Sequence, residues 1–301
     1  MEGTRAFAAC HPAVLLLYFL LVLAFGVCLM HPACLAVSLG SALGCAVLLR
    51  GWRAVGRSLV WILPASLLAA AVNPLLVHQG VTVMGYLPWG APLTKESLLY
   101  GLAAGALLGG VLLWALCWST VFTADRIVYL FGRLTPALAL VLTMTLSFLP
   151  RLRRQLEQTR LAQRALTGEA KHRKSRLHRG AALLSVLVTW SLEGSIETSQ
   201  AMVGRGYGLP GRTAYTDYRL VRRDKGLLLW LALAGAGVVG GWAAGSLRFV
   251  YYPAVAGTWG PGTGSLLVLQ LALSLTPVLL EGWEALQWKR KNSPARWSRP
   301  L

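Results

Sequence analysis

The chain has 301 residues, of which 55% are hydrophobic and 13% are charged. This balance is too apolar for a soluble protein of that length, so it excludes a soluble globular protein and indicates a membrane protein. The formal net charge is +18, and the positions of the basic residues decide what that charge means.

The first apolar run covers residues 13 to 30 and follows a short segment that contains Arg5. It has no A-x-A cleavage pattern and leads directly into a second run at 33 to 49, so we interpret it as a retained first span rather than a signal peptide. His31 and Pro32 separate the two runs and predict a tight turn between them.

Four further runs along the chain approach the length of about 20 residues that crosses a bilayer. Two other apolar stretches, at 136 to 150 and 180 to 192, are too short to cross upright and are predicted to lie at the interface or against other helices. The sequence therefore predicts an all-α, polytopic membrane protein with about six transmembrane helices. The four later spans are expected at 58 to 77, 98 to 122, 226 to 247 and 264 to 280.

Basic residues are distributed unequally among the predicted loops. With the N-terminus in the cytoplasm, only Lys95 and Arg248 of the 29 lysines and arginines fall outside, as expected when positive loops remain inside. The longest basic run, 151 to 179, lacks the interleaved aromatic residues of a nucleic-acid-binding face. Topology and anionic lipid therefore explain the charge, no nucleic acid is expected as a partner, and both termini are predicted to be cytoplasmic.

The block between the fourth and fifth spans is predicted to contain two helices. After Pro150, leucines at helical spacing among basic residues indicate an amphipathic surface helix. A second helix is expected from about Ala181 to the sequence Gly204-Arg205-Gly206, where glycine favours termination and a cation suits the last turn. The chain thus divides into transmembrane helices at 1–135, a cytoplasmic helical region at 136–225, and further transmembrane helices with a basic tail at 226–301.

Enzyme and metal motifs do not occur in the sequence. The five cysteines show no C-x-x-C spacing, the histidines share no helix face, and no nucleotide-binding or hydrolase motif is found. Acidic residues near span ends are better explained by structural or interfacial roles than by a proton relay. No catalytic residue, metal site or cofactor is predicted, and the acidic residues concerned are Glu193, Glu197, Glu281 and Glu284.

The segment QAMVGRGYGLPGRTAY, residues 200 to 215, resembles the second signature of the transmembrane T component of energy-coupling factor (ECF) transporters. In that family the signature is usually Ala-Arg-Gly at the end of a coupling helix. The resemblance covers most of the chain up to Lys225. Its other segments are HPAVLLLYF near the N-terminus, NPLLVHQGVTV at 73 to 83, LPWGAPLTKESLLYGLAAG at 87 to 105, ADRIVYLFGRLTPALALVL at 124 to 142 and TWSLEGSIET at 189 to 198.

The resemblance implies an ABC-type importer subunit in a bacterial plasma membrane. Two ATP-binding cassette ATPase subunits would hydrolyse ATP, and a small membrane-embedded S component would bind a vitamin or a metal ion such as cobalt or nickel. The stretches at 136 to 150 and 180 to 192 would belong to long coupling helices. Arg205 would enter a groove of one ATPase, with Ala201, Gly204 and Gly206 beside it.

The first signature departs from the family pattern. Aligning Ala162 and Gln163 with it places Leu166 and Thr167 where arginine and glycine usually stand, and Arg164 is the nearest cation. Either Arg164 replaces the missing arginine or one ATPase grips this helix through apolar contacts, and the residues leave both open. The predicted partner-binding residues are therefore Ala162, Arg164, Ala201, Gly204, Arg205 and Gly206.

The alternative function is a self-contained secondary transporter or membrane enzyme. A secondary transporter is expected to show inverted repeats with matched broken spans, and the sequence has no convincing repeat. A membrane enzyme is expected to gather ionisable residues at one membrane face, and no such pattern is found. The T component is the favoured prediction.

Overall fold

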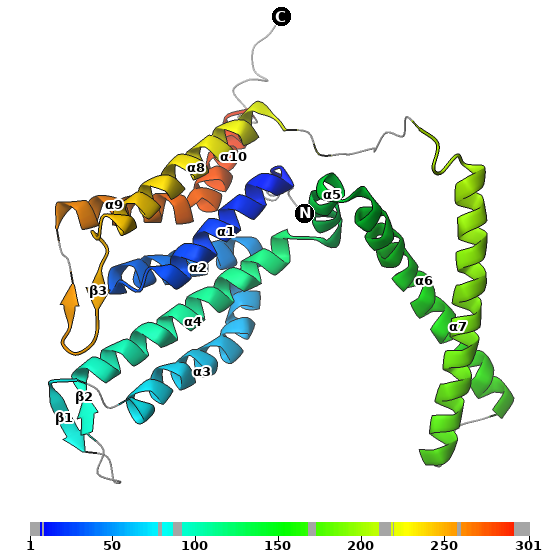
Figure 1. Ribbon diagram of the computed structural model, residues 1–301, viewed down its shortest axis with the longest axis horizontal. Coiled ribbons are helices and arrows are strands. Elements are labelled where there is room, and N and C mark those ends of the chain that lie inside the picture. Colours follow the sequence, from blue (N-terminus) through cyan, green and yellow to red (C-terminus); the bar gives the residue numbers. More distant parts are fainter. Residues whose placement is uncertain are drawn as a thin grey trace, which may run out of the picture. The chain divides into compact units, whose positions relative to one another are not determined.

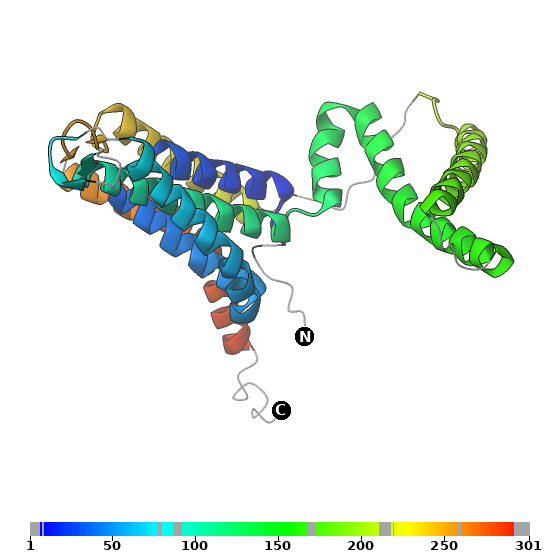
Figure 2. The ribbon, with the colours of Figure 1, turned by 90° about the horizontal axis from the view of Figure 1, so that it is seen from below.

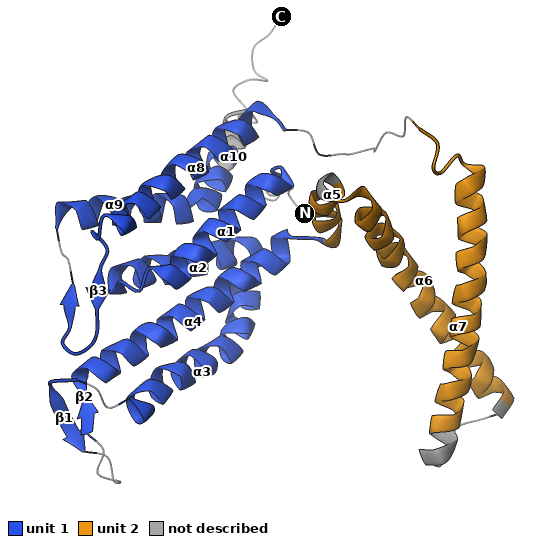
Figure 3. Cartoon of the chain, in the orientation of Figure 1, with its two compact units in different colours: residues 1–123, 218–301 blue, residues 124–217 orange. Residues whose placement is uncertain are grey.

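The computed structural model shows a chain built almost entirely of helices (Figure 1). Packing contacts divide it into two compact units, which are coloured separately in Figure 3: unit 1 contains residues 1–123 and 218–301, and unit 2 contains residues 124–217. The structure describes residues 7, 9–77, 80–86, 92–167, 173–210, 218, 220–257 and 260–291.

Unit 1 holds the helices that are long and apolar enough to cross a membrane. Four single helices meet that description, and α9 with the first part of α10 forms a fifth candidate that is bent by 53°. α1 is apolar but has 17 residues. The structure thus supports four to five spans, and the predicted number of about six stays a prediction. The helices are α1 (Pro12–Cys28), α2 (Pro32–Arg50), α3 (Trp52–Leu76), α4 (Lys95–Val121), α8 (Arg222–Ala243), α9 (Pro261–Ser274) and α10 (Thr276–Lys291).

The first two helices begin with the same local device. Pro12 and Pro32 occupy the first helical positions, where a missing N–H costs nothing because it would have no helical partner. The preceding histidines cap the helices: Nδ1 of His11 accepts the N–H of Ala13 at 3.2 Å, and Nδ1 of His31 accepts that of Ala33 at 3.3 Å. The predicted turn at His31-Pro32 is confirmed.

The α3–α4 contact depends on small residues at every fourth position. On α4, Gly105 lies so close to α3 that a Cβ there would meet the carbonyl oxygen of Ser66 at 2.6 Å and Cβ of Ala70 at 2.8 Å. Gly109 would similarly meet Oγ of Ser66 at 2.9 Å. Such small-residue seams let transmembrane helices pack backbone to backbone without a hydrophobic driving force.

Aromatic side chains fill the centre of unit 1. Tyr18 lies edge-on to Trp114 with ring centroids 6.0 Å apart, and its hydroxyl donates to the carbonyl of Ser274 at 2.8 Å. The indole N–H of Trp114 donates to Oγ of Ser38 at 3.2 Å. Both rings are fully buried, so the tyrosine hydroxyl and the indole N–H form their hydrogen bonds inside the bundle. These bonds link α1, α2, α4 and α9.

Two short hairpins, which the sequence did not predict, cap one end of unit 1. They join α3 to α4 and α8 to α9, and the two views of the ribbon place them at the same end of the bundle (Figures 1 and 2). The α1–α2 turn lies there too, because the Tyr251 hydroxyl donates to the Met30 carbonyl at 2.8 Å. The strands are β1 (Val83–Tyr86), β2 (Pro92–Thr94), β3 (Phe249–Val250) and β4 (Ala256–Gly257).

A buried carboxylate anchors the first hairpin. Glu96, in the first turn of α4, accepts the hydroxyl of Thr82 and also its N–H, the latter at 3.3 Å. Thr94 caps the same helix by accepting the N–H of Ser97. Because Glu96 is buried at a helix N-terminus with donors around it, its charge is compensated locally.

Unit 2 consists of α5 (Ala124–Leu134), α6 (Pro136–Thr167) and α7 (Arg173–Gly204). α6 and α7 have 32 residues each, a length of roughly 48 Å at 1.5 Å per residue. They pack together where the rings of Phe148 and Trp190 stack, 5.7 Å apart. None of the unit 2 residues that the structure describes is buried.

Two sequence-based boundaries in unit 2 need correction. A helix was expected to start after Pro150, but α6 runs through this proline without ending, because the apolar turns before it and the amphipathic turns after it keep the other helical hydrogen bonds. The second helix was expected from about Ala181 but begins at Arg173, since the intervening basic residues are good helix formers. The separate helix α5 was not predicted.

Candidate partner-binding site

α7 ends in a hydrogen-bonded turn that is built around Arg205. The N–H of Tyr207 donates to the carbonyl of Met202 at 3.0 Å, and the N–H of Gly206 donates to that of Val203 at 2.9 Å. This pair of bonds is the Schellman motif, which satisfies the last carbonyls of a helix. Arg205 is the C-cap residue, so the backbone holds it at the point where the helix stops.

Gly206 supplies the backbone conformation that this turn requires. Its φ is +81°, in the left-handed region where a side chain is disfavoured. The predicted termination of this helix by glycine is confirmed. Gly204, by contrast, is an ordinary helical residue with open space at its Cβ position.

The tip of α7 presents a cation among exposed apolar groups. Arg205 and Ala201 are exposed, and so are Val203, Tyr207 and Leu209. Among the residues that the structure describes, none forms an ion pair with Arg205. A guanidinium has five hydrogen-bond donors, and here it is exposed and surrounded by apolar side chains. This combination is typical of the residues that anchor protein–protein interfaces.

The other predicted site residues, Ala162 and Arg164, lie near the end of α6 and are exposed. The structure does not bring them together with Arg205. α6 ends shortly before α7 begins, whereas Arg205 follows the far end of α7, so the two arginines are separated by most of the roughly 48 Å length of α7. The predicted site residues therefore form two separate groups in unit 2 rather than one composite group.

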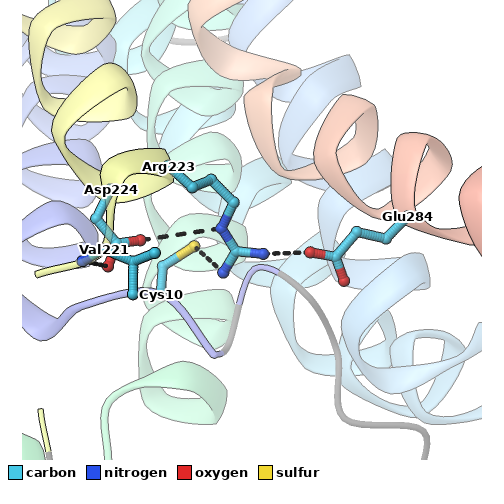
Figure 4. Close-up of polar contacts among 5 residues, drawn as sticks. All are labelled: Cys10, Val221, Arg223, Asp224 and Glu284. Atoms are coloured by element: carbon cyan, nitrogen blue, oxygen red, sulfur yellow. Dashed lines mark hydrogen bonds and ion pairs between the residues drawn. The ribbon is translucent and has the colours of Figure 1, made fainter. Parts of the chain in front are cut away.

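A polar cluster in unit 1, which the sequence analysis did not predict, joins three distant segments (Figure 4). The Arg223 guanidinium at the start of α8 donates to Glu284 of α10 and lies 3.6 Å from Sγ of Cys10 and 4.0 Å from Oδ1 of Asp224. Asp224 also accepts the N–H of Val221 at 3.3 Å, which closes the first turn of α8. No local pattern could reveal it, because 61 residues separate Arg223 from Glu284.

The electrostatics of this cluster are those of a partly buried structural contact. Burial raises the pKa of the Cys10 thiol, and the nearby guanidinium of Arg223 opposes that rise. Arg223 and Glu284 are both substantially exposed, whereas Asp224 is buried. The cluster therefore fixes the start of α8 against α10 and the N-terminal segment, and it presents no free nucleophile.

In the described ranges, no group of three or more His, Cys, Asp or Glu side chains could hold a metal ion.

The long apolar helices define the class as a helical membrane protein. Comparison of the chain with models of known protein families and with curated proteins found no match.

Proposed function

We propose that this chain is the transmembrane T component of an ECF-type ABC importer in a bacterial plasma membrane. It would pass ATP-driven motion of two ATPase subunits to an S component that takes up a vitamin or a metal ion. The observation that supports this most is the tip of α7, where an exposed arginine stands on a glycine-terminated turn at the end of a 32-residue helix. ATP hydrolysis belongs to the partners, and this chain is not an enzyme.

Exposed apolar side chains along unit 2 support a second partner. On α7 they recur every fourth residue and therefore form one continuous stripe on the helix. A stripe of this kind is not stable in water and calls for a lipid or protein cover. The S component is the proposed cover. The residues of the α7 stripe are Leu184, Val188, Leu192 and Ile196.

The orientation of unit 1 is supported by its two ends. Lys95 and Arg248, the two basic residues that the sequence analysis places outside, both lie at the hairpin end of the bundle. Arg223 lies at the other end, at the start of α8. With the hairpins outside, α4 and α8 lead into and out of unit 2 from the cytoplasmic side.

The length of α6 and α7 and the separation of Arg205 and Arg164 support a mechanism of mechanical coupling. ATP binding would close the ATPase pair and move the helix ends at Arg205 and Arg164, and two long continuous helices would carry that displacement. Because the two arginines lie far apart, each can engage a different ATPase subunit. The helices would then shift the surface on which the S component rests, and that shift would release its substrate.

The experiment compares tagged wild type with Arg205→Glu after purification from the native host in mild detergent. We expect two ATPases and a small membrane protein with the wild type, and loss of the ATPases with the variant, since a reversed charge leaves an acidic groove unpaired. Lys225→Glu is the matched control, because Lys225 is exposed on α8 in unit 1. ATPases that remain with Arg205→Glu, or a wild-type chain that purifies alone, would contradict the proposal and favour a self-contained transporter.

A further inference from the structure

The second half of α6 carries five exposed arginines, and three of them share one face. Arg153, Arg160 and Arg164 are separated by seven and four residues, about two turns and one turn of an α-helix, so they lie on one side. Arg151 lies on the opposite side of the same helix, and Arg154 lies between the two sides. We call Arg153, Arg160 and Arg164 the arginine face.

Intrahelical pairing does not account for this face. Glu157 lies on the same side, four residues after Arg153 and three before Arg160, at spacings where helix side chains can reach each other. Even so, none of these four side chains forms an ion pair with any residue in the described part of the chain. The three guanidinium groups are therefore directed outward, with their donors available.

Apolar groups accompany the arginines. Leu149, four residues before Arg153 on the same side, is 47% exposed, and Leu161, at the edge of the face beside Arg160, is 64% exposed. Arginine next to exposed leucine is a pattern expected of a protein interface, where arginine is an enriched anchor residue and apolar contacts exclude water around it.

We propose that the arginine face docks into an acidic groove of a protein partner, which under the proposed function is one ATPase subunit. This inference rests on the proposed function and extends the contact from the helix ends to the side of α6. Glu157 favours a protein over an anionic bilayer, because a uniformly negative surface offers no partner to a carboxylate in the middle of the face. A protein groove can place a cation opposite Glu157 and acidic groups opposite the arginines.

The test uses the full-length tagged chain purified from its native host, with two variants of equal charge change on one helix. Arg160→Glu reverses the arginine face, and Arg151→Glu is the matched control on the opposite side. Retained ATP-binding cassette subunits are quantified by mass spectrometry over a series of salt concentrations. We expect Arg160→Glu to lower retention about tenfold and to weaken its salt dependence, and Arg151→Glu to stay within about twofold of wild type. Helical content and elution volume of each variant are compared with wild type, and Arg160→Gln, which keeps a good helix former, serves as a second variant.

Three results would overturn the docking face. Equal loss in both charge reversals would show an effect of net charge, and unchanged retention in Arg160→Glu would show that the face is not used. Reduced binding of purified Arg160→Glu to phosphatidylglycerol vesicles with unchanged ATPase retention would assign the face to lipid. If Arg205→Glu releases the ATPases and Arg160→Glu does not, the proposed function is supported and only the docking of the arginine face is contradicted. If wild type retains no ATPase, both fall.

Discussion

Units 1 and 2 are both helical, but they differ in what surrounds their side chains. Every buried residue in the described part of the chain belongs to unit 1, whose helices meet through glycine seams, edge-on aromatic rings and a polar cluster. Unit 2 has two helices of 32 residues and no buried residue among those described. Unit 1 therefore has a packed interior, whereas the described side chains of unit 2 are exposed or half-buried.

The largest effect is expected from disturbing the seam in unit 1. Gly105→Ala places a methyl group against Ser66 and Ala70 of α3, and such overpacking should cost about 1–3 kcal/mol. The apparent melting temperature of the purified chain in detergent should fall. Gly40→Ala is the control, because nothing lies within 4 Å of its Cβ position. Equal melting temperatures for the two variants would show that α3 and α4 are not in close contact.

A change at the tip of α7 should act locally. Gly206→Ala forces a methyl group onto a φ of +81°, with a cost of roughly 1–2 kcal/mol, so the final turn should fray. Hydrogen exchange of the Tyr207 amide, which bonds to Met202, should accelerate while exchange in unit 1 stays unchanged.

Gly204→Ala provides the opposite result in the same turn. This glycine is helical and unobstructed, so alanine should stabilise the helix by roughly 0.5–1 kcal/mol and slow exchange at Tyr207. It also creates the Ala-Arg-Gly order that is usual in the family that the segment resembles, so ATPase retention should persist. Faster exchange in this variant would mean that the turn does not have the geometry described.

The smallest effect is expected at the polar cluster of unit 1. Arg223 and Glu284 are each 41% exposed, and such pairs contribute about 0.2–1 kcal/mol. A double-mutant cycle of Arg223→Met and Glu284→Gln, followed by thermal unfolding, should give a coupling in that range. A coupling of zero would mean that the pair does not hold α8 to α10. Exchange at Tyr207 should be unaffected, which would separate this cluster from the α7 tip.

Much of the fold could be predicted because membrane helices are encoded in local composition. The apolar runs at 33 to 49 and 98 to 122 are helices nearly as expected, and the His31-Pro32 turn and the glycine end of α7 follow from backbone chemistry. The division of the sequence at residues 135 and 225 and the partner roles of Arg205 and Arg164 stay predictions.

The features that sequence reasoning missed depend on contacts between distant residues. The sequence shows Gly101, Gly105 and Gly109 at every fourth position of α4. It does not show that they face Ser66 and Ala70 of α3, because that contact joins distant parts of the chain. The Arg223–Glu284 pair and the first hairpin, which Glu96 anchors, arise in the same way. Helix α5 was missed because its 11 residues are too few for a membrane span and mix apolar with charged side chains.

The most direct measurement replaces Tyr207, at the tip of α7, with a photo-crosslinking phenylalanine derivative in cells. Tyr86 in β1, an exposed tyrosine at the hairpin end, is replaced in a parallel strain. We predict that position 207 crosslinks to an ATP-binding cassette ATPase and that position 86 does not. A crosslink from position 86 to the ATPase, or none from position 207, would contradict the claim that α7 ends in the groove of a cytoplasmic ATPase.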